Sequence, residues 1–275
     1  MSPFFLHNFV FQYIIHSVII LDKKILEQYL NQKLNITIFD ELDSTNTYLK
    51  KVGSSCKKEN QLVIALSQTG GRGRMGRSFY SPNGTGIYFS LLLHPEFSAE
   101  KSLLLTVMAA VSVAETIMKY NSNDVKIKWV NDIYIDGKKV CGILTEGSIN
   151  ADKKLDYAVV GIGINLIAPE NGFPDDIKDI ATSIFPGKDK ENIKEKIVAD
   201  VVNKFFDMYN GKDDSYIKRY KEYSYLTGKK INIISGDSVR LATVIDITDD
   251  CHLLVKNEND EIEEISSGDV SVRLI

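Results

Sequence analysis

The strand-like segments between residues 125 and 166 constrain the fold most strongly. Residues 125–130, 132–135, 140–149 and 157–166 are rich in apolar and β-branched side chains, and Asp136-Gly137 separates two of them. An Asp-Gly pair supplies the two positive φ angles that a two-residue hairpin turn requires. Strands joined by short turns pair antiparallel, because a parallel pair needs a long crossover connection. We therefore expect a largely antiparallel, mixed sheet rather than the βαβ alternation of a doubly wound fold.

Further strands and several helices complete the prediction of an α+β fold. Helical spacing of apolar residues is clearest in residues 98–120, and the expected elements are strands at 36–39, 62–67 and 86–93 and helices at 23–32, 44–52, 98–120, 191–209 and 215–225. Asp22, Ser44 and Ser98 are suited to capping the helices that follow them. Residues 70–86, with six glycines, and residues 168–188, with three prolines, are predicted loops.

The character of the chain changes near Leu226. Five short strand-like segments follow closely on one another, at residues 229–235, 238–248, 252–257, 261–266 and 270–274. Such spacing is typical of a small barrel. We expect an N-terminal extension of uncertain role at 1–34, a catalytic domain at 35–226 and a barrel domain at 227–275.

Charge and cysteine content exclude several classes of protein. Lys and Arg total 33 and Asp and Glu total 37, which gives a formal net charge of −4. Domains that coat nucleic acid are usually strongly basic, so no nucleic-acid partner is expected. The three cysteines form no disulfide framework, and they share no metal-ligand spacing with the four histidines. A reducing, cytoplasmic location fits this pattern.

The N-terminal residues 4–21 are the stretch closest to a membrane signal. They are rich in Phe, Ile and Val, but His7, Gln12 and His16 interrupt them and no basic n-region precedes them. The segment is marginal as a membrane span. We favour an additional helix, a strand or an extension, and we expect no association with a membrane.

The segment Gly71-Arg72-Gly73-Arg74-Met75-Gly76-Arg77 carries the strongest chemical signal. Glycines let the backbone approach a ligand, and arginines offer a fixed fork of donors to phosphate or carboxylate. The sequence fits neither a Walker A loop nor the GxGxxG pattern. Taken alone, the run also fits a solvated loop or an RNA contact.

Three other segments are informative only in combination. Lys128-Trp129-Val130-Asn131-Asp132 ends a strand whose lysines share one face, as in a surface hairpin. Gly161 and Gly163 alternate on a strand, which indicates either a ligand lying against it or tight sheet packing. Asp43-Ser44-Thr45-Asn46 reads as a helix cap or as a polar ligand site. Together the segments suit attack by a carboxylate on a phosphate, a reaction that needs charge neutralisation and alignment but no enzyme nucleophile.

In these motifs the sequence resembles the bacterial biotin protein ligases (biotin–acetyl-CoA-carboxylase ligases). The resemblance rests on the segments above and on Gln68-Thr69-Gly70, Lys139-Val140-Cys141-Gly142-Ile143-Leu144 and Gly161-Ile162-Gly163-Ile164-Asn165, in the family's order from about residue 35 onward. It implies a catalytic domain related to class II aminoacyl-tRNA synthetases and biotin/lipoyl ligases, followed by an SH3-like barrel. The implied enzyme makes biotinyl-5′-AMP from biotin and ATP with Mg²⁺. It then passes biotin to one lysine of the biotin carboxyl-carrier domain of a carboxylase.

The resemblance also implies roles for individual residues. The catalytic residues would be Arg74, Lys139 and Asp132. The residues that bind biotin would be Ser44, Thr45, Asn46, Gln68, Arg72, Gly73, Arg74 and Lys139. The residues that bind the nucleotide would be Arg74, Arg77, Lys128, Asn131 and Asn165. The metal ligands stay unassigned, and the assembly is left open between a monomer and a homodimer.

The sequence departs from the family pattern at two places, and three other functions compete with the one that the resemblance implies. Val130 stands where the family usually has proline. Only 43 residues precede Ser44, without a legible helix-turn-helix, so we expect a ligase-only member. A lipoyl-protein ligase would carry an Arg-Arg-x-x-Gly-Gly-Gly loop instead of the Gly-Arg-Gly-Arg-Met-Gly-Arg run. A biotin-sensing DNA repressor is disfavoured by the net charge. An RNA-binding module would interleave stacking aromatics with basic residues.

Overall fold

A seven-stranded sheet forms the centre of the molecule. The computed structural model describes residues 21–53, 55, 59–187, 192–266 and 270–274. The strand order is β1-β2-β3-β7-β6-β5-β4. The strands are β1 (Asn35–Leu42), β2 (Gln61–Gln68), β3 (Gly86–Leu93), β4 (Val125–Lys128), β5 (Asp132–Ile135), β6 (Lys138–Ile149) and β7 (Leu155–Asn165). Only β1 and β2 pair in parallel, so the predicted mixed, largely antiparallel sheet is confirmed.

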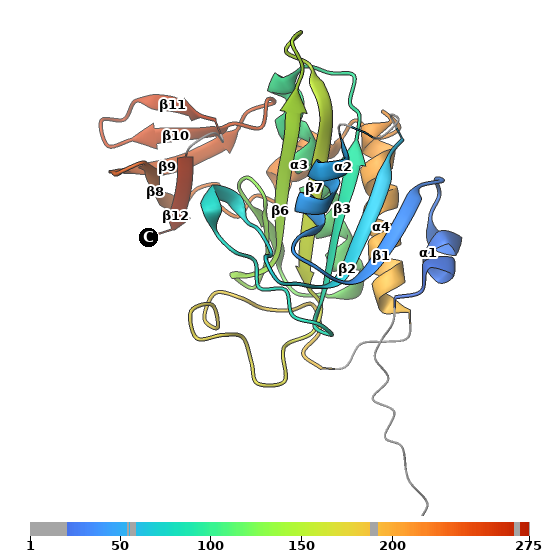
Figure 1. Cartoon of the computed structure of the whole chain (residues 1–275). Helices are drawn as coiled ribbons and strands as arrows, with labels where there is room; N and C mark the ends of the chain where they lie inside the picture. Colours follow the sequence, from blue (N-terminus) through green and yellow to red (C-terminus); the bar gives the residue numbers. More distant parts are fainter. Residues whose placement is uncertain (1–20, 54, 56–58, 188–191, 267–269, 275) are drawn as a thin grey trace, which may run out of the picture.

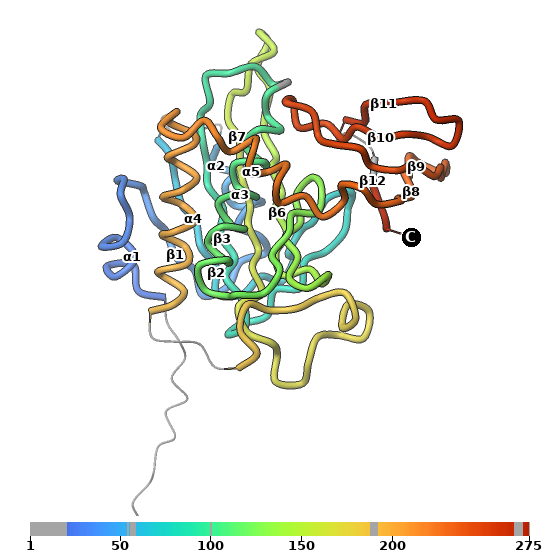
Figure 2. The backbone as a smooth tube through the Cα atoms, turned by 180° about the vertical axis from the view of Figure 1, so that it is seen from behind, coloured from blue at the N-terminus to red at the C-terminus, as the bar shows by residue number. Residues whose placement is uncertain are grey.

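Helices cover both faces of this sheet. On one face lie α3 (Ser102–Tyr120), α4 (Ile193–Tyr209) and α5 (Tyr216–Glu222), and α1 (Lys23–Tyr29) packs beside α4 (Figure 2). The opposite face carries α2 (Thr45–Gly53), which is seen in front of the sheet in Figure 1. Its fully buried Leu49 packs with Val63, Leu92 and Val159 of the sheet. The polar cavity of the candidate site described below lies on the α2 face.

Helix α3 is apolar on nearly every side because other elements surround it. By length and composition alone it could cross a membrane, and it is the one such helix among the described residues. Two thirds of its apolar window, 67%, is buried inside the molecule, as in the core helix of a folded domain. The expected apolar segment at residues 4–21 lies outside the described part of the chain, except for Leu21.

The structure confirms some of the turns and helix caps expected from the sequence, but not all of them. Asp136 and Gly137 have φ values of 49° and 79°, which confirms the hairpin turn between β5 and β6. The Asp22 side chain accepts hydrogen bonds from the Lys24 and Ile25 amides and caps α1 as predicted. The cap expected from Ser98 is wrong, because a short 3₁₀ turn, η2 (Ala99–Lys101), precedes α3 and the Ser98 side chain accepts no capping bond.

A second, five-stranded sheet follows the catalytic part of the chain. Its strands are β8 (Lys230–Ser235), β9 (Ser238–Ile247), β10 (Leu253–Asn257), β11 (Ile262–Ile265) and β12 (Val270–Leu274), in the order β11-β10-β9-β8-β12 with every pair antiparallel. These five strands are those expected from the spacing of turns. The sheet lies at one side of the molecule, to the left of β6 in Figure 1. The indole Nε1 of Trp129 donates to the Cys251 carbonyl at 2.9 Å, which joins the two sheets directly.

Candidate functional site

The arginine–glycine segment forms a narrow hairpin rather than an extended loop. Arg72 pairs with Ser78 in an antiparallel bridge, the Gly73 amide donates to the Arg77 carbonyl at 2.7 Å, and the Phe79 amide donates to Gly71 at 2.9 Å. A 3₁₀ turn, η1 (Arg74–Gly76), makes the tip. At the base, the Thr69 and Gly70 amides donate to carbonyls at the end of β1 and the start of α2. These bonds anchor the base of the hairpin between β1 and α2.

A small polar cavity lies beneath this hairpin. Five of the residues expected to bind biotin line it, namely Ser44, Thr45, Asn46, Gln68 and Arg72. The Gln68 Oε1 atom accepts the Thr45 backbone amide at 2.9 Å, and its Nε2 donates to Ser81 at 3.1 Å. The Ser44, Thr45 and Asn46 side chains are almost fully buried. Buried polar groups need fixed partners, so this network sets the orientation of the donors and acceptors in the cavity.

The alternating glycines of β7 make room for protein side chains. A Cβ atom at Gly161 would overlap the Asn46 amide, with its Cγ only 2.7 Å away, and one at Gly163 would lie 2.6 Å from the Phe79 ring. Gly142 on the neighbouring β6 likewise leaves space for Lys139. Of the two readings left open by the sequence, close packing explains both β7 glycines. Gly161 and Gly163 also line the polar cavity. The close packing and the open space of the cavity therefore both depend on the absence of a side chain at these two positions.

A second cavity, of about 120 Å³, adjoins the first and is strongly basic. Arg72, Phe79 and Gly142 line both cavities. The second is also lined by Gly73 and by the predicted residues Arg74, Arg77, Lys128, Asn131, Asp132 and Lys139. Lys139 Nζ lies 2.7 Å from Asp132 Oδ1, and Arg74 donates to Asn131 Oδ1 at 3.5 Å. One carboxylate among five basic side chains leaves an excess of positive charge that suits a polyanion.

Burial changes the acid–base properties of two of these cations. Desolvation lowers the pKa of the Arg74 guanidinium, and the nearby Asp132 carboxylate partly opposes that effect. Desolvation also lowers the pKa of Lys128, where Asp132 again opposes the shift and Lys139 and Arg77 add to it. A bound anion would relieve the repulsion between these cations. The cluster is therefore best satisfied when a phosphate or carboxylate is present.

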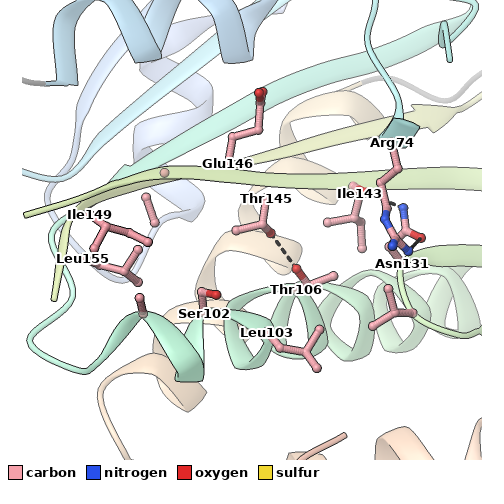
Figure 3. A pocket seen from close by; sticks show the side chains of 14 residues that line it. Arg74, Ser102, Leu103, Thr106, Asn131, Ile143, Thr145, Glu146, Ile149 and Leu155 are labelled. Carbon is pink, nitrogen blue, oxygen red and sulfur yellow. Dashed lines mark hydrogen bonds between the residues drawn. The ribbon is translucent and has the colours of Figure 1, made fainter. Parts of the chain in front are cut away.

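A third cavity, of about 310 Å³, lies between β6 and α3 (Figure 3). Thr106 of α3 donates to Thr145 of β6 at 2.7 Å across it. Arg74 and Asn131 lie at one end, so this cavity reaches residues that also line the basic one. The three cavities together offer a continuous set of polar groups from α2, through the hairpin, to the N-terminal turns of α3.

One predicted residue lies apart from the others. Asn165, at the end of β7, donates from Nδ2 to the Thr182 carbonyl at 3.0 Å and lines none of the three cavities. The Thr182 amide in turn donates to the Lys139 carbonyl, and the Lys139 amide donates to Ile180. Asn165 thus anchors the 168–187 segment, which pairs with the backbone at Lys139.

Three residues of the site carried no signal in the sequence. Glu146 of β6 binds Asn46, Lys50 and Arg72. Phe79 lines both smaller cavities, and the hydroxyl of the fully buried Ser90 lies 2.7 Å from both Thr45 Oγ1 and Asn46 Oδ1. A single Glu, Phe or Ser on a strand is common in proteins and does not by itself indicate a functional site. Only the sheet register brings these residues to the site.

A buried polar cavity joined to a basic cavity defines a class of protein. It suits an enzyme that joins a small carboxylic acid to a nucleotide phosphate, with fixed donors for one and positive charge for the other. The sequence predicts an enzyme of this class. The mixed sheet followed by a small β sheet agrees with it.

Comparisons with known proteins define the family. The model of the biotin/lipoate A/B protein ligase family matches residues 38–165, and that of the biotin protein ligase C-terminal domain matches residues 227–273. The bifunctional ligase/repressor BirA of Bacillus subtilis is 33% identical over 250 residues, covering 85% of this chain and 72% of that protein. For BirA of Escherichia coli the identity is 34% over 135 residues, covering 48% of this chain and 40% of that protein.

A solved structure agrees with this assignment. The biotin protein ligase from Aquifex aeolicus in complex with biotin and ATP superposes with a TM-score of 0.71 and 28% identity, covering 88% of this chain and 99% of that chain. The chain described here belongs to the biotin protein ligase family. The resemblance inferred from the motifs is thereby confirmed, together with the α+β fold.

Proposed function

We propose that this biotin protein ligase activates biotin with ATP to biotinyl-5′-AMP and transfers the biotinyl group to a lysine of a carboxylase carrier domain. The observation that carries the proposal is that two cavities suited to different chemical groups adjoin each other. The polar cavity with Thr45 and Gln68 suits an uncharged ring that donates and accepts hydrogen bonds. The basic cavity with Lys139 suits a carboxylate beside a phosphate. Biotin carries such a ring at one end and a carboxylate at the other.

In the first step, a biotin carboxylate oxygen attacks the α-phosphorus of ATP and pyrophosphate leaves. Two anions must approach each other, so the cost of bringing them together is chiefly electrostatic. We assign Arg74 and Lys139 to the region where carboxylate and α-phosphate meet, because both line the basic cavity and Lys139 follows the rigid β5–β6 hairpin. Arg72 and Gly73 of the hairpin are assigned to the biotin side of that meeting point.

The triphosphate is assigned to the remaining polar groups of the basic cavity. Arg77, Lys128 and Asn131 supply two cations and an amide there. The described residues contain no group of three His, Cys, Asp or Glu side chains that could hold a metal ion. Asp132 is the one carboxylate lining the basic cavity. Mg²⁺ is often held by one or two carboxylates together with phosphates and water, so Asp132 fits an ion that arrives with ATP and offsets the charge of the leaving pyrophosphate.

Asn165 keeps a separate place in the proposal. Its side chain fastens the 168–187 segment, and that segment pairs with the backbone of Lys139. We propose that Asn165 contributes to nucleotide binding by holding this segment in place beside the basic cavity.

In the second step, the amine of the acceptor lysine attacks the biotinyl carbonyl and AMP leaves. A lysine amine has a pKa near 10.4 and must lose a proton to react. Asp132 is assigned to orienting this amine, because its carboxylate lies at the junction of the Lys139 and Asn131 side chains. The acceptor lysine would approach through the cavity between β6 and α3, which reaches Arg74 and Asn131 (Figure 3).

The organisation of the chain forms part of the same proposal. We assign residues 35–226 to the catalytic domain and 227–275 to the SH3-like domain, with residues 1–34 as an extension of uncertain role. The acceptor is a biotin carboxyl-carrier domain, and the assembly is a monomer or a homodimer. Cys141 and Cys251 are free thiols in the structure, which supports a cytoplasmic location.

Exchange of label between pyrophosphate and ATP tests the proposal. The exchange should depend on biotin and should not occur with lipoate or octanoate, because the hairpin has the Gly-Arg-Gly-Arg-Met-Gly-Arg sequence rather than that of lipoyl ligases. Comparable exchange with lipoate would favour the second candidate, a lipoyl-protein ligase, since the matching family model covers both activities.

A further inference from the structure

Glu146 occupies a central but unassigned place beside the proposed biotin cavity. It lies on β6, and Figure 3 shows its side chain on the opposite face of the strand from Thr145, away from α3. It lines the cavity between β6 and α3 but not the polar cavity. Its side chain is 17% exposed, so its charge is only partly screened by water.

Three polar groups converge on this carboxylate from separate parts of the chain. Lys50 of α2 donates to Oε1 at 2.6 Å, while Arg72 of the hairpin and Asn46 of α2 donate to Oε2 at 3.0 and 3.1 Å. Burial alone would raise the pKa of Glu146, but these partners outweigh it and the pKa is lowered. Glu146 is therefore a carboxylate anion at neutral pH, and it connects α2, the hairpin and β6.

Both donors of the Asn46 amide are used within the protein. Its Oδ1 lies 2.7 Å from Ser90 Oγ, and its Nδ2 donates both to the Leu144 carbonyl at 3.0 Å and to Glu146. An amide nitrogen has two hydrogens, so these two bonds use both of its donors. Asn46 thus acts as part of the wall of the cavity, and Glu146 is one of the groups that fix which way its amide points.

The Arg72 contact has a different consequence. Arg72 is 42% exposed and lies in the arm of the hairpin that covers the cavity. The ion pair with Glu146 ties that arm to β6, while Arg74 at the tip donates to Asn131 Oδ1 at 3.5 Å. Loosening the Arg72–Glu146 pair frees the arm without removing any group that lines the cavity floor.

We propose that Glu146 is a positioning residue that holds the hairpin closed over bound biotin through Arg72 and fixes the Asn46 amide. In this role it contacts neither biotin nor the nucleotide. It sets how long biotin and biotinyl-5′-AMP stay bound, rather than the rate of the chemical step. This inference rests on the proposed function of the site.

The test compares Glu146→Gln with the parent protein. Glutamine keeps the size of the side chain and one acceptor oxygen but removes the charge that binds Arg72 and Lys50. An ion pair of this exposure is worth about 1 kcal/mol, so biotin should dissociate about fivefold faster and its KM should rise similarly. The maximal rate of biotin-dependent exchange and the KM for ATP should stay within about twofold of the parent.

Two controls separate positioning from general loss of structure. Glu263→Gln removes a carboxylate from the Arg240 ion pair of the second sheet, at 2.6 Å, and should leave biotin dissociation unchanged. In an Arg72→Gln background the part of the effect that acts through Arg72 is already lost, so adding Glu146→Gln should raise the dissociation rate by clearly less than it does in the parent. A full, additive effect in that background would overturn the assignment to Arg72.

Salt gives a further readout that needs no variant. Dissociation of biotinol, the uncharged alcohol analogue of biotin, should speed up with ionic strength in the parent and hardly change in Glu146→Gln, because salt screens the ion pair. Equal salt dependence in both proteins, or a biotin dissociation rate that the substitution leaves unaltered, would overturn the proposal. If the parent shows no biotin-dependent exchange, the proposed function itself fails; if it does and Glu146→Gln behaves like it, only the role of Glu146 fails.

Discussion

Substitution of Gly161 by alanine should separate biotin binding from folding. The added Cβ would lie 2.7 Å from Asn46 Cγ and closer still to its Oδ1, so the Asn46 amide must move. That amide is held by hydrogen bonds involving Ser90, Leu144 and Glu146. A net hydrogen bond contributes about 1 kcal/mol, so displacing the amide costs up to about 3 kcal/mol. Overpacking of a dense interior costs about 1–3 kcal/mol, which agrees.

This cost is smaller than the stability of an ordinary domain, about 5–15 kcal/mol, so the variant should fold. Because Asn46 forms part of the cavity wall, biotin should bind about ten- to a hundredfold more weakly. Titration calorimetry gives the dissociation constant, and a thermal melt reports folding. Gly187→Ala is the matched control, since a Cβ there would meet nothing within 4 Å. If Gly161→Ala bound biotin within about twofold of the control, the assignment of this cavity would be refuted.

Three further substitutions test other parts of the account. Lys139→Ala should lower biotin-dependent pyrophosphate–ATP exchange by about 10²–10³-fold, because a fixed donor to the reacting anions is lost; a change under about threefold would contradict its role. Arg74→Ala should let biotinyl-5′-AMP escape before transfer, so mass spectrometry should find biotin on lysines of an unrelated bystander protein; label confined to the carrier would count against closure by the hairpin tip. Leu49→Ala should destabilise the protein by about 2–5 kcal/mol in urea unfolding, because Leu49 is the fully buried residue by which α2 packs on the sheet; a loss below about 1 kcal/mol would show that α2 packs differently.

Local signals in the sequence were sufficient for most of the fold. The Asp136-Gly137 turn set the β5–β6 hairpin, because few other residue pairs accept two positive φ angles. Apolar spacing located α3, although its start was misplaced. The 3₁₀ turn after Ser98 brings the Lys101 amide to the Ser98 carbonyl, and the Ser98 side chain accepts no capping bond.

The sequence predicts most of the residues that line the site, but not the contacts between them. The motif residues of the hairpin and of the β4–β6 region do line adjoining cavities. Asn46 and Glu146 are 100 residues apart, and only the pairing of β6 with β7 brings Glu146 to α2. The alternation of the β7 glycines is visible in the sequence, but the side chains that pack against them, Asn46 and Phe79, follow only from the folded structure. Asn165 was grouped with the nucleotide-binding residues, whereas its side chain fastens the 168–187 segment.

Oxygen transfer from biotin to AMP tests the central claim most directly. If a biotin carboxylate oxygen attacks the α-phosphorus of ATP, that oxygen becomes the bridge of the mixed anhydride and leaves with AMP when the carrier lysine attacks the carbonyl. Biotin labelled with ¹⁸O in its carboxylate should therefore yield AMP that carries one heavy oxygen, together with biotin on a single carrier lysine. Unlabelled AMP, or ADP and phosphate as products, would contradict the account.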